Sequence, residues 1–378
     1  MRTHQELGFC ALAISCGPAL LSTNIGCGDV APQPRTPAVQ QGSSPTRTPD
    51  PPDPETTASA AASFPQDRSS APAPGEPASV ATPLASVPVL LASAQRGSSN
   101  LAQDCNYIYW TWSDGFQPRG FVMRVSKRGG NPETVVSGQA DLTALAVDAS
   151  FAYWTNSAAA GKIMKISLNG GRPEMVAVDP SSEVAVDASN VYWFSLGRLK
   201  MVSKRGGTAA TLATGDEESS GRIALDSTHV YWTNPGTWEE NCGFCKKDGS
   251  VMKVPIAGGK QTTLVAGQPG PGVIAVDSTG VYYATENVYG GIGDGRIMKL
   301  PLDGGRPEPL ATNQSPSGLA IDESSVYWPG DGAVLKVSKS GGAVATLASI
   351  SDATTDFLGD ETALYWLTDG GSLMKLQK

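Results

Sequence analysis

Residues 145–155 read Leu-Ala-Val-Asp-Ala-Ser-Phe-Ala-Tyr-Trp-Thr, an apolar run that ends in Asp and leads through a short turn to an aromatic pair. This pattern occurs seven times, at intervals of 44, 39, 39, 51, 45 and 38 residues between aromatic pairs. A period of roughly 40 to 45 residues built from short strands is typical of a β-propeller blade. The pairs are Tyr109/Trp110, Tyr153/Trp154, Tyr192/Trp193, Tyr231/Trp232, Tyr282/Tyr283, Tyr327/Trp328 and Tyr365/Trp366.

Each unit is predicted to form four strands. In the second unit these are residues 145–148, 152–155, 163–166 and 174–177, which are apolar runs bounded by Gly, Asn, Asp and Ser. None of the runs is long or 3.6-periodic enough for a helix. A Gly-Gly pair precedes the fourth strand in most units, and we expect it at the centre of a two-residue hairpin, where positive φ is required. The sequence therefore predicts an all-β, seven-bladed propeller.

The seventh unit supplies three strands and ends at Lys378 without a fourth. An unassigned apolar run, Pro88 to Ser93, lies ahead of the first unit and is similar to the fourth-strand run Thr262 to Gly267. We expect this N-terminal strand to pair with the C-terminal three and so remove the open edge of the last blade.

The unit pattern of IAVD, then VYWT, then GxIMKLPLDGG resembles YWTD-type β-propeller repeats, with NHL-type and related bacterial propellers as neighbours. The resemblance covers about residues 88–378. Its motifs are specific for the fold but poor for function, because propellers host many unrelated activities. Two features depart from the YWTD family. There are seven units where six are typical, and Asn156 and Asn234 stand where the Asp after YWT is expected. Partner preferences of that family are therefore not carried over.

Residues 1–27 are predicted to be a signal peptide, because their apolar stretch is too short to span a bilayer as a permanent helix. Ile25-Gly26-Cys27 resembles a bacterial lipobox, in which Cys27 is lipidated, although Asn24 stands where Leu is usual. A cleaved signal without lipidation is the alternative. We expect an exported protein of the cell envelope, either a membrane-anchored lipoprotein or a periplasmic or extracellular protein.

Residues 28–87 are predicted to be a disordered linker. Thirteen of the 28 prolines lie between Pro32 and Pro83, so the segment cannot bury enough apolar area to offset chain entropy. The whole chain carries 28 basic and 36 acidic residues without a basic cluster, which argues against nucleic-acid or anionic-lipid binding by the folded domain. We expect one propeller over 88–378, a monomer, with membrane contact only through a possible lipid anchor.

Repeated charged residues are interpreted as structural. Each unit's Asp precedes a turn, where a short acidic side chain caps backbone N–H groups. A basic residue recurs in the third strand of the units, and we expect it to make an ion pair or a cation–π contact between blades. A single functional site needs only one copy of its residues.

Cys242 and Cys245 form the one concentrated cysteine motif of the folded region, within the longest insertion. The setting lacks the βαβ unit of a thioredoxin and the four ligands of structural zinc. A loop-stapling disulfide between them is predicted, which fits an oxidising compartment. Cys105 lies in a turn at the far end of a blade and is expected to stay unpaired.

No catalytic residue, metal or cofactor is predicted, because His229 alone supplies no nucleophile, base and orienting group. Virginiamycin-lyase-like and gluconolactonase-like propellers, which the chain resembles in fold only, rely on His or on carboxylate-bound divalent metal in the channel. A binding module for a protein, glycan or small ligand is favoured, and the alternative is a channel-centred hydrolase or lyase. Insertions between second and third strands predict a ligand-binding patch on one rim, made of Trp112, Trp238, Glu239, Glu240, Phe244, Tyr289 and Asp294.

Overall fold

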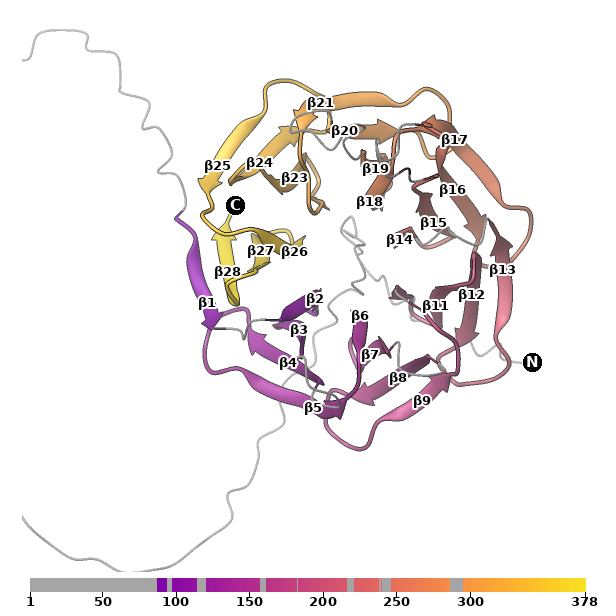
Figure 1. Cartoon of the computed structure of the whole chain (residues 1–378), viewed down its shortest axis with the longest axis vertical. Helices are drawn as coiled ribbons and strands as arrows, with labels where there is room; N and C mark the ends of the chain where they lie inside the picture. The colour runs from indigo at the N-terminus through magenta and orange to yellow at the C-terminus, as the bar shows by residue number, and fades with distance from the viewer. Residues whose placement is uncertain are drawn as a thin grey trace, which may run out of the picture. The chain divides into compact units, whose positions relative to one another are not determined.

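The computed structural model describes residues 87–378, apart from 94–96, 114–119, 157–160, 182, 216–220, 238, 240–245 and 286–294. The described strands form seven four-stranded antiparallel sheets arranged as a ring, so the predicted seven-bladed propeller is confirmed (Figure 1). Within these residues, no helix is long and apolar enough to cross a membrane.

Blade 1 consists of β2 (Ser98–Gln103), β3 (Tyr107–Ser113), β4 (Gly120–Ser126) and β5 (Glu133–Gln139). Blade 2 consists of β6 (Leu142–Val147), β7 (Phe151–Asn156), β8 (Lys162–Ser167) and β9 (Glu174–Ala177). Blade 3 consists of β10 (Val184–Val186), β11 (Asn190–Ser195), β12 (Arg198–Ser203) and β13 (Ala210–Thr214). Blade 4 consists of β14 (Ile223–Leu225), β15 (His229–Asn234), β16 (Gly249–Pro255) and β17 (Thr262–Gln268).

Blade 5 consists of β18 (Pro271–Asp277), β19 (Gly280–Thr285), β20 (Gly295–Leu300) and β21 (Glu308–Gln314). Blade 6 consists of β22 (Ala320–Ile321), β23 (Ser325–Gly330), β24 (Ala333–Ser338) and β25 (Ala345–Ser349). Blade 7 consists of β26 (Thr354–Gly359), β27 (Ala363–Thr368), β28 (Ser372–Gln377) and β1 (Val89–Ser93). In each blade the first-named strand lies at the centre of the ring and the last at its periphery (Figure 1).

Blade 7 is closed by the two ends of the propeller. Strand β1 pairs antiparallel with β28, with Val89 opposite Lys375 and Ser93 opposite Ser372. The predicted closing strand is confirmed and begins one residue later than expected. A paired β28 leaves no open sheet edge inside the ring, which is the physical advantage of this closure.

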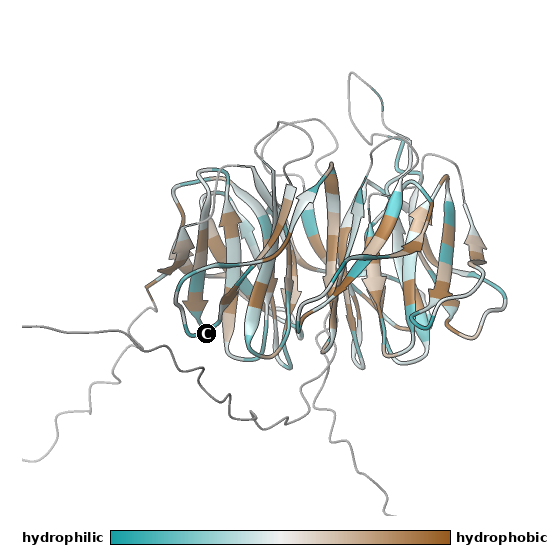
Figure 2. Ribbon diagram, turned by 90° about the horizontal axis from the view of Figure 1, so that it is seen from below, coloured by the Kyte–Doolittle hydropathy of each residue, from teal (hydrophilic) through white to brown (hydrophobic). Residues whose placement is uncertain are grey.

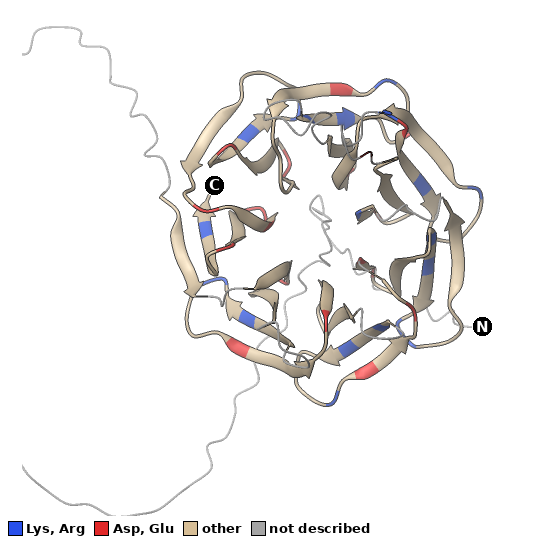
Figure 3. Cartoon of the chain, viewed as in Figure 1, with Lys and Arg blue, Asp and Glu red and all other residues tan. Residues whose placement is uncertain are grey.

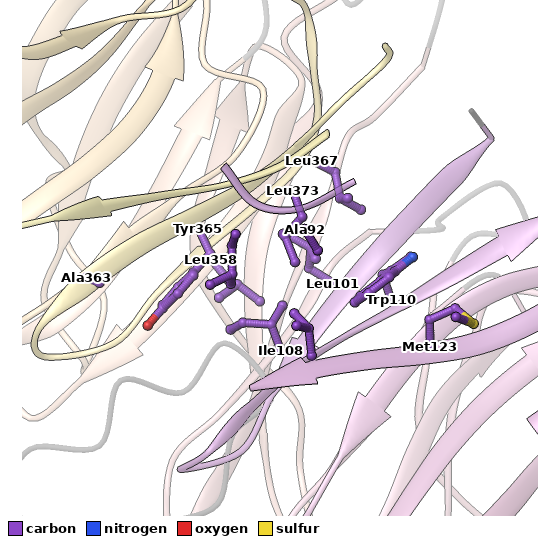
Figure 4. Packing of buried hydrophobic residues seen from close by; sticks show 12 residues of the cluster. Ala92, Leu101, Ile108, Trp110, Met123, Leu358, Ala363, Tyr365, Leu367 and Leu373 are labelled. Atoms are coloured by element: carbon purple, nitrogen blue, oxygen red, sulfur yellow. The ribbon is translucent and has the colours of Figure 1, made fainter. Parts of the chain in front are cut away.

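The core lies between the blades, because each sheet is covered on both faces by its neighbours. The seven aromatic pairs are buried, and the second strands are buried almost along their whole length. Hydrophobic residues accordingly concentrate on the strands (Figure 2). One cluster joins blade 7 to blade 1 and includes Leu91, Trp110, Tyr365 and Leu373 (Figure 4). Closure of the ring is therefore hydrophobic as well as hydrogen-bonded.

The repeated aspartates cap turns, as predicted. Asp148 Oδ1 accepts bonds from the N–H groups of Ser150 and Phe151, both at 2.7 Å, and Oδ2 accepts from the Tyr153 hydroxyl at 3.0 Å. The same tyrosine bond occurs in six blades; in blade 5 the Tyr282 hydroxyl contacts Thr279 instead. The ring of carboxylates is thus structural, and it also satisfies a buried phenol in the neighbouring strand.

Basic residues lie on the third strands (Figure 3), and in blades 1, 2, 4, 5 and 7 they donate to a carbonyl oxygen of the next blade. Lys165 Nζ donates to the carbonyl oxygen of Lys204 at 3.2 Å, and Lys253 Nζ donates to that of Leu302 at 2.7 Å. An inter-blade ion pair or cation–π contact was predicted; the acceptors are turn carbonyls, and Lys253 also forms an inter-blade ion pair with Asp303 at 3.5 Å. A second set of lysines, at the turn after the third strand, pairs with the capping aspartate of the preceding blade, as in Lys127 with Asp360 at 2.8 Å.

The Gly-Gly pairs do not form the centres of two-residue hairpins, so that prediction was wrong. In blade 1 the bond from Gly129 N to Ser126 O, at 2.8 Å, closes a turn whose central residues are Lys127 and Arg128. Gly129 and Gly130 follow this turn with φ of 91° and 125°, so the expected positive φ is confirmed. The glycines redirect the chain from the turn toward the fourth strand, a conformation that other residues rarely adopt.

Candidate functional site

The innermost strands of all seven blades line one cavity at the centre of the ring. Each blade contributes the residue that lies four positions before its capping aspartate, and we call these seven residues the channel ring. The cavity has a volume of about 90 Å³, whereas about 10–15 Å³ of such space holds one water molecule. It therefore has room for several waters or a small ligand group. The channel ring consists of Asn100, Ala144, Glu183, Arg222, Val273, Gly318 and Asp356.

The channel-ring position, which lies in the first strand or just before it, does not repeat from blade to blade. The next residue along is large and apolar in every blade, because it also packs against neighbouring strands, and it gives the cavity a hydrophobic wall. Channel-ring residues change from blade to blade in size and charge, since they face the centre. The apolar wall residues are Leu101, Leu145, Val184, Ile223, Ile274, Leu319 and Phe357.

Two adjacent blades place opposite charges in this cavity. Arg222 Nη1 lies 3.1 Å from Glu183 Oε2, which joins blade 4 to blade 3 by an ion pair. The Arg222 side chain is 52% exposed and that of Glu183 is 13% exposed. The guanidinium is therefore reached by water through the cavity, while the carboxylate is set back in the wall. Ser181 Oγ fixes the backbone at Glu183 by donating to its carbonyl oxygen at 2.7 Å.

A second carboxylate enters the cavity from blade 7. Asp356 Oδ2 accepts the Leu101 N–H of blade 1 at 2.6 Å, and Oδ1 accepts the Phe357 N–H at 2.8 Å. Beside it, Asn100 sits at a bulge of β2 with φ of 51°. Its Nδ2 donates to Ser99 Oγ and Thr111 Oγ1, both at 3.0 Å. Both carboxylates are thus held by bonds that cross or adjoin blade boundaries.

The electrostatics of the cavity are dominated by burial of negative charge. Burial raises the pKa of Glu183, against the opposing charge of Arg222, and the Asp356 charge raises it further. Burial likewise raises the pKa of Asp356, although Arg222 and the two N–H donors act to lower it. The Glu183 charge in turn raises the pKa of Arg222. Two carboxyls share one guanidinium, so the cavity has unneutralised negative charge when both ionise.

This arrangement can bind a ligand through charge and hydrogen bonds, or transfer protons to one. Carboxyl groups with raised pKa values are the usual candidates for general acids and bases. Within the described residues, no group of three or more His, Cys, Asp or Glu side chains is arranged as a metal site. Of these two functions, ligand binding requires only the charges and hydrogen-bonding groups described above.

The predicted rim patch falls mostly outside the described residues, which omit Trp238, Glu240, Phe244, Tyr289 and Asp294. Trp112 stacks on Phe121 of its own blade, with ring centroids 4.6 Å apart and planes at 29°, and it packs against the cluster between blades 7 and 1. Glu239 Oε1 lies 2.9 Å from Lys246 Nζ. The rim patch stays a prediction.

The connections that carry these insertions do leave the ring at the predicted place. They join the second and third strands of blades 1, 4 and 5, after Ser113, Asn234 and Thr285. In a four-stranded meander these connections share a rim with the beginning of each first strand, where the channel ring lies. We call it the insertion rim, and the channel ring belongs to it.

Cys105 is disulfide-bonded, so the expectation of an unpaired Cys105 was wrong. The position of Cys105 in a turn at the end of a blade did not indicate a disulfide, because sequence spacing does not determine which cysteines pair. The remaining cysteines, including Cys242, Cys245 and Cys27, lie outside the described residues. The Cys242–Cys245 disulfide and the lipidation of Cys27 stay predictions.

Glu183, Arg222 and Asp356 were missed at the level of the sequence, where no carboxylates outside the repeat were grouped. A signal for them exists. When the seven units are aligned on the capping aspartate, the position four residues earlier is the variable one, and these charges stand at it. These charges can be found by aligning the seven units with one another, and no catalytic motif is needed to find them.

Comparison with solved structures finds β-propellers. The chain is similar to a virginiamycin B lyase from Staphylococcus aureus, with a TM-score of 0.58 and 13% identity over 77% of this chain and 98% of the lyase. It is also similar to the extracellular domain of a one component system from B. thetaiotaomicron, with a TM-score of 0.55 and 11% identity over 76% of this chain and 39% of that one. A third similar structure is a prolyl endopeptidase, with a TM-score of 0.53 and 12% identity over 75% and 50%.

At these identities the likeness shows the fold alone. No protein-family model matches the chain, and no curated protein matches its sequence. Fold and cavity together define a seven-bladed β-propeller with a charged central site on the insertion rim.

Proposed function

We propose that this chain is a binding module that takes its ligand at the insertion rim, in the cavity bounded by the channel ring. The convergence of Glu183, Arg222 and Asp356 on one cavity carries this proposal. Ala144 and Val273 occupy equivalent positions in other blades, so packing does not require a charge there. Charges taken out of water cost free energy unless they are paired. Three of them at one cavity indicate selection for a ligand.

The ligand is a protein, a glycan or a small molecule, and the insertions of blades 4 and 5 extend the binding surface beyond the cavity. Loops on a rigid scaffold are the usual place for recognition. Trp238 and Tyr289 are the aromatic anchors that we assign to this outer part, because exposed aromatics dominate binding at many interfaces.

We also infer that the protein is exported and tethered to the cell surface, and that it is a divergent YWTD-like propeller. Support comes from the apolar N-terminal stretch that ends in Ile25-Gly26-Cys27 and from the proline-rich segment after it. The similar propeller from B. thetaiotaomicron is itself an extracellular domain, which agrees with an exported fold.

A channel-centred hydrolase or lyase is the second candidate function. The observation that favours it is the pair of carboxyls, Glu183 and Asp356, whose pKa values burial raises beside a guanidinium. Such a pair can supply a general acid and a general base. A lyase and a peptidase among the similar folds show that propellers accompany such activities in other proteins.

Glycan-array binding and thermal-shift screening of small molecules test the proposal on the full chain. A channel variant, Glu183→Gln/Asp356→Asn, and a rim variant, Trp238→Ala/Tyr289→Ala, separate the two parts of the surface. Asp303→Asn is the matched control, since it neutralises a fully exposed carboxylate far from the cavity.

We expect a ligand that the wild type and the control bind and that the channel variant loses while its melting temperature is retained. A ligand bound equally by all variants would contradict the assignment of the site. Mass spectrometry of each ligand after incubation decides between the two candidate functions, because only an enzyme leaves a product.

A further inference from the structure

The cavity has a definite charge balance that selects among ligands. Among the described residues of its lining there are two carboxylates and one guanidinium, and the others are uncharged. Arg222 is already paired with Glu183 at 3.1 Å. In the described residues no basic side chain lies within ion-pair distance of Asp356, whose nearest donors are two backbone N–H groups. Asp356 therefore has no described cation in direct contact with it, although the charge of Arg222 acts on it from a distance.

Asp356 also has unused hydrogen-bonding capacity. An ionised carboxylate offers about four acceptor positions, and the Leu101 and Phe357 N–H groups occupy one on each oxygen. A ligand that donates several hydrogen bonds from a positive centre would satisfy both the charge and the free acceptor positions. An anion would meet two carboxylates in order to reach one guanidinium that is already paired.

The geometry points to a primary ammonium group as the ligand feature recognised here: an alkylammonium ligand whose N–H groups bond to Asp356 and whose chain lies against the apolar wall. This inference rests on the proposed function and specifies its ligand class. Glu183 contributes a second negative charge from across the cavity, while Arg222 limits how much positive charge the site accepts.

The composition of the cavity lining also indicates which cations the cavity excludes. A quaternary ammonium donates no hydrogen bond and is recognised by several aromatic faces, whereas Phe357 is the single aromatic residue among the described residues of this lining. Leu145, Val184 and Ile274 supply aliphatic surface. A volume of about 90 Å³ suits a short alkyl chain. The site should therefore prefer a primary alkylammonium to its trimethylated analogue.

Titration of the full chain by NMR or calorimetry tests this inference, with n-butylammonium as the probe and 1-butanol, butyrate and butyltrimethylammonium as matched competitors. We expect n-butylammonium to bind at least tenfold more tightly than any of the three. Asp356→Asn should weaken its binding about tenfold or more, because the charge-assisted bonds are lost. Asp303→Asn, the same chemical change on an exposed turn, should leave binding unchanged.

Arg222→Gln provides a readout that structural damage cannot imitate. Removal of the positive charge should tighten n-butylammonium binding several-fold, whereas a distorted cavity would weaken it. The inference is overturned if 1-butanol or butyrate binds as well as n-butylammonium, or if Arg222→Gln weakens binding as Asp356→Asn does. If the channel variant fails to bind some ligand other than an alkylammonium, the proposed function still holds and only this inference fails. If no ligand depends on the channel ring for binding, both the inference and the proposed function are contradicted.

Discussion

Replacement of Leu91 by alanine tests whether strand β1 closes the ring. Leu91 lies in the outermost strand of blade 7, yet it is only 9% exposed because it belongs to the cluster that includes Trp110 and Leu373. Its neighbour Leu90 is 57% exposed. The two leucines are adjacent in one strand and chemically identical, so Leu90→Ala is a matched control for the same loss of three carbons.

The magnitude follows from burial. Truncation of a buried leucine to alanine costs about 2–5 kcal/mol, which includes the cavity left behind, and we expect about 2–3 kcal/mol at this peripheral site. At roughly 2–4 °C per kcal/mol for a large domain, Leu91→Ala should lower the melting temperature by about 4–12 °C. The exposed Leu90 loses little contact on truncation, so its variant should stay within about 0.5–1 kcal/mol of the wild type.

Thermal and urea denaturation of the full-length variants, followed by circular dichroism, measures both differences. Deletion of residues 88–93 should destabilise the propeller more than Leu91→Ala, whereas deletion of residues 28–87 should leave the melting temperature nearly unchanged. Equal effects of the two leucine variants, or of the two deletions, would refute closure by β1.

Three further predictions follow from polar contacts and the N-terminal sequence. Tyr153→Phe removes the hydroxyl that donates to Asp148 at 3.0 Å and should lower the free energy of unfolding by about 1–2 kcal/mol in urea titrations; no change would mean that the bond is not stabilising. Although burial acts to raise the pKa of Asp360, the hydrogen bond and charge of Lys127 and the donors of Thr362 lower it to about 2. This pKa lies below the unfolded value of about 3.9. The Lys127–Asp360 pair should therefore contribute about 2 kcal/mol of stability above about pH 3.9, and this contribution should be lost as the pH falls toward 2. A Lys127→Met variant whose stability changes with pH as the wild type's does over this range would contradict the prediction. Cys27→Ser should move the protein from the membrane fraction to the soluble exported fraction, and unchanged partitioning would count against lipidation.

Much of the fold could be predicted because its determinants are local. The strand runs, the turn residues and the 38 to 51-residue spacing of the aromatic pairs repeat along the chain, and each unit specifies one blade without reference to the others. Even the pairing of β1 with β28, which joins the two ends of the domain, was predictable, since a unit with three strands and a run without partners imply each other. The capping role of the aspartates was predictable from the turns that follow them.

The site could not be predicted because it depends on which side chains face the centre of the ring and on how closure of the ring brings distant blades together. Glu183 and Arg222 are 39 residues apart and form an ion pair only because consecutive blades stand side by side. Asp356 reaches the same cavity from the last blade, across a ring whose curvature no single unit reveals. Which first-strand residue faces the centre depends on bulges and strand twist. The Cys105 disulfide escaped prediction for a related reason, since pairing depends on distance in space.

By itself, the sequence determined a seven-bladed β-propeller, its closing strand and its capped turns, because these arise from contacts within one blade or from counting blades. Only the tertiary structure decided that the most variable position at the inner strands forms a ring around a cavity, and that two carboxylates and a guanidinium meet there. Packing between blades repeats and so leaves a periodic signal, whereas convergence on a central axis uses each residue once and leaves only a position that varies among the aligned units.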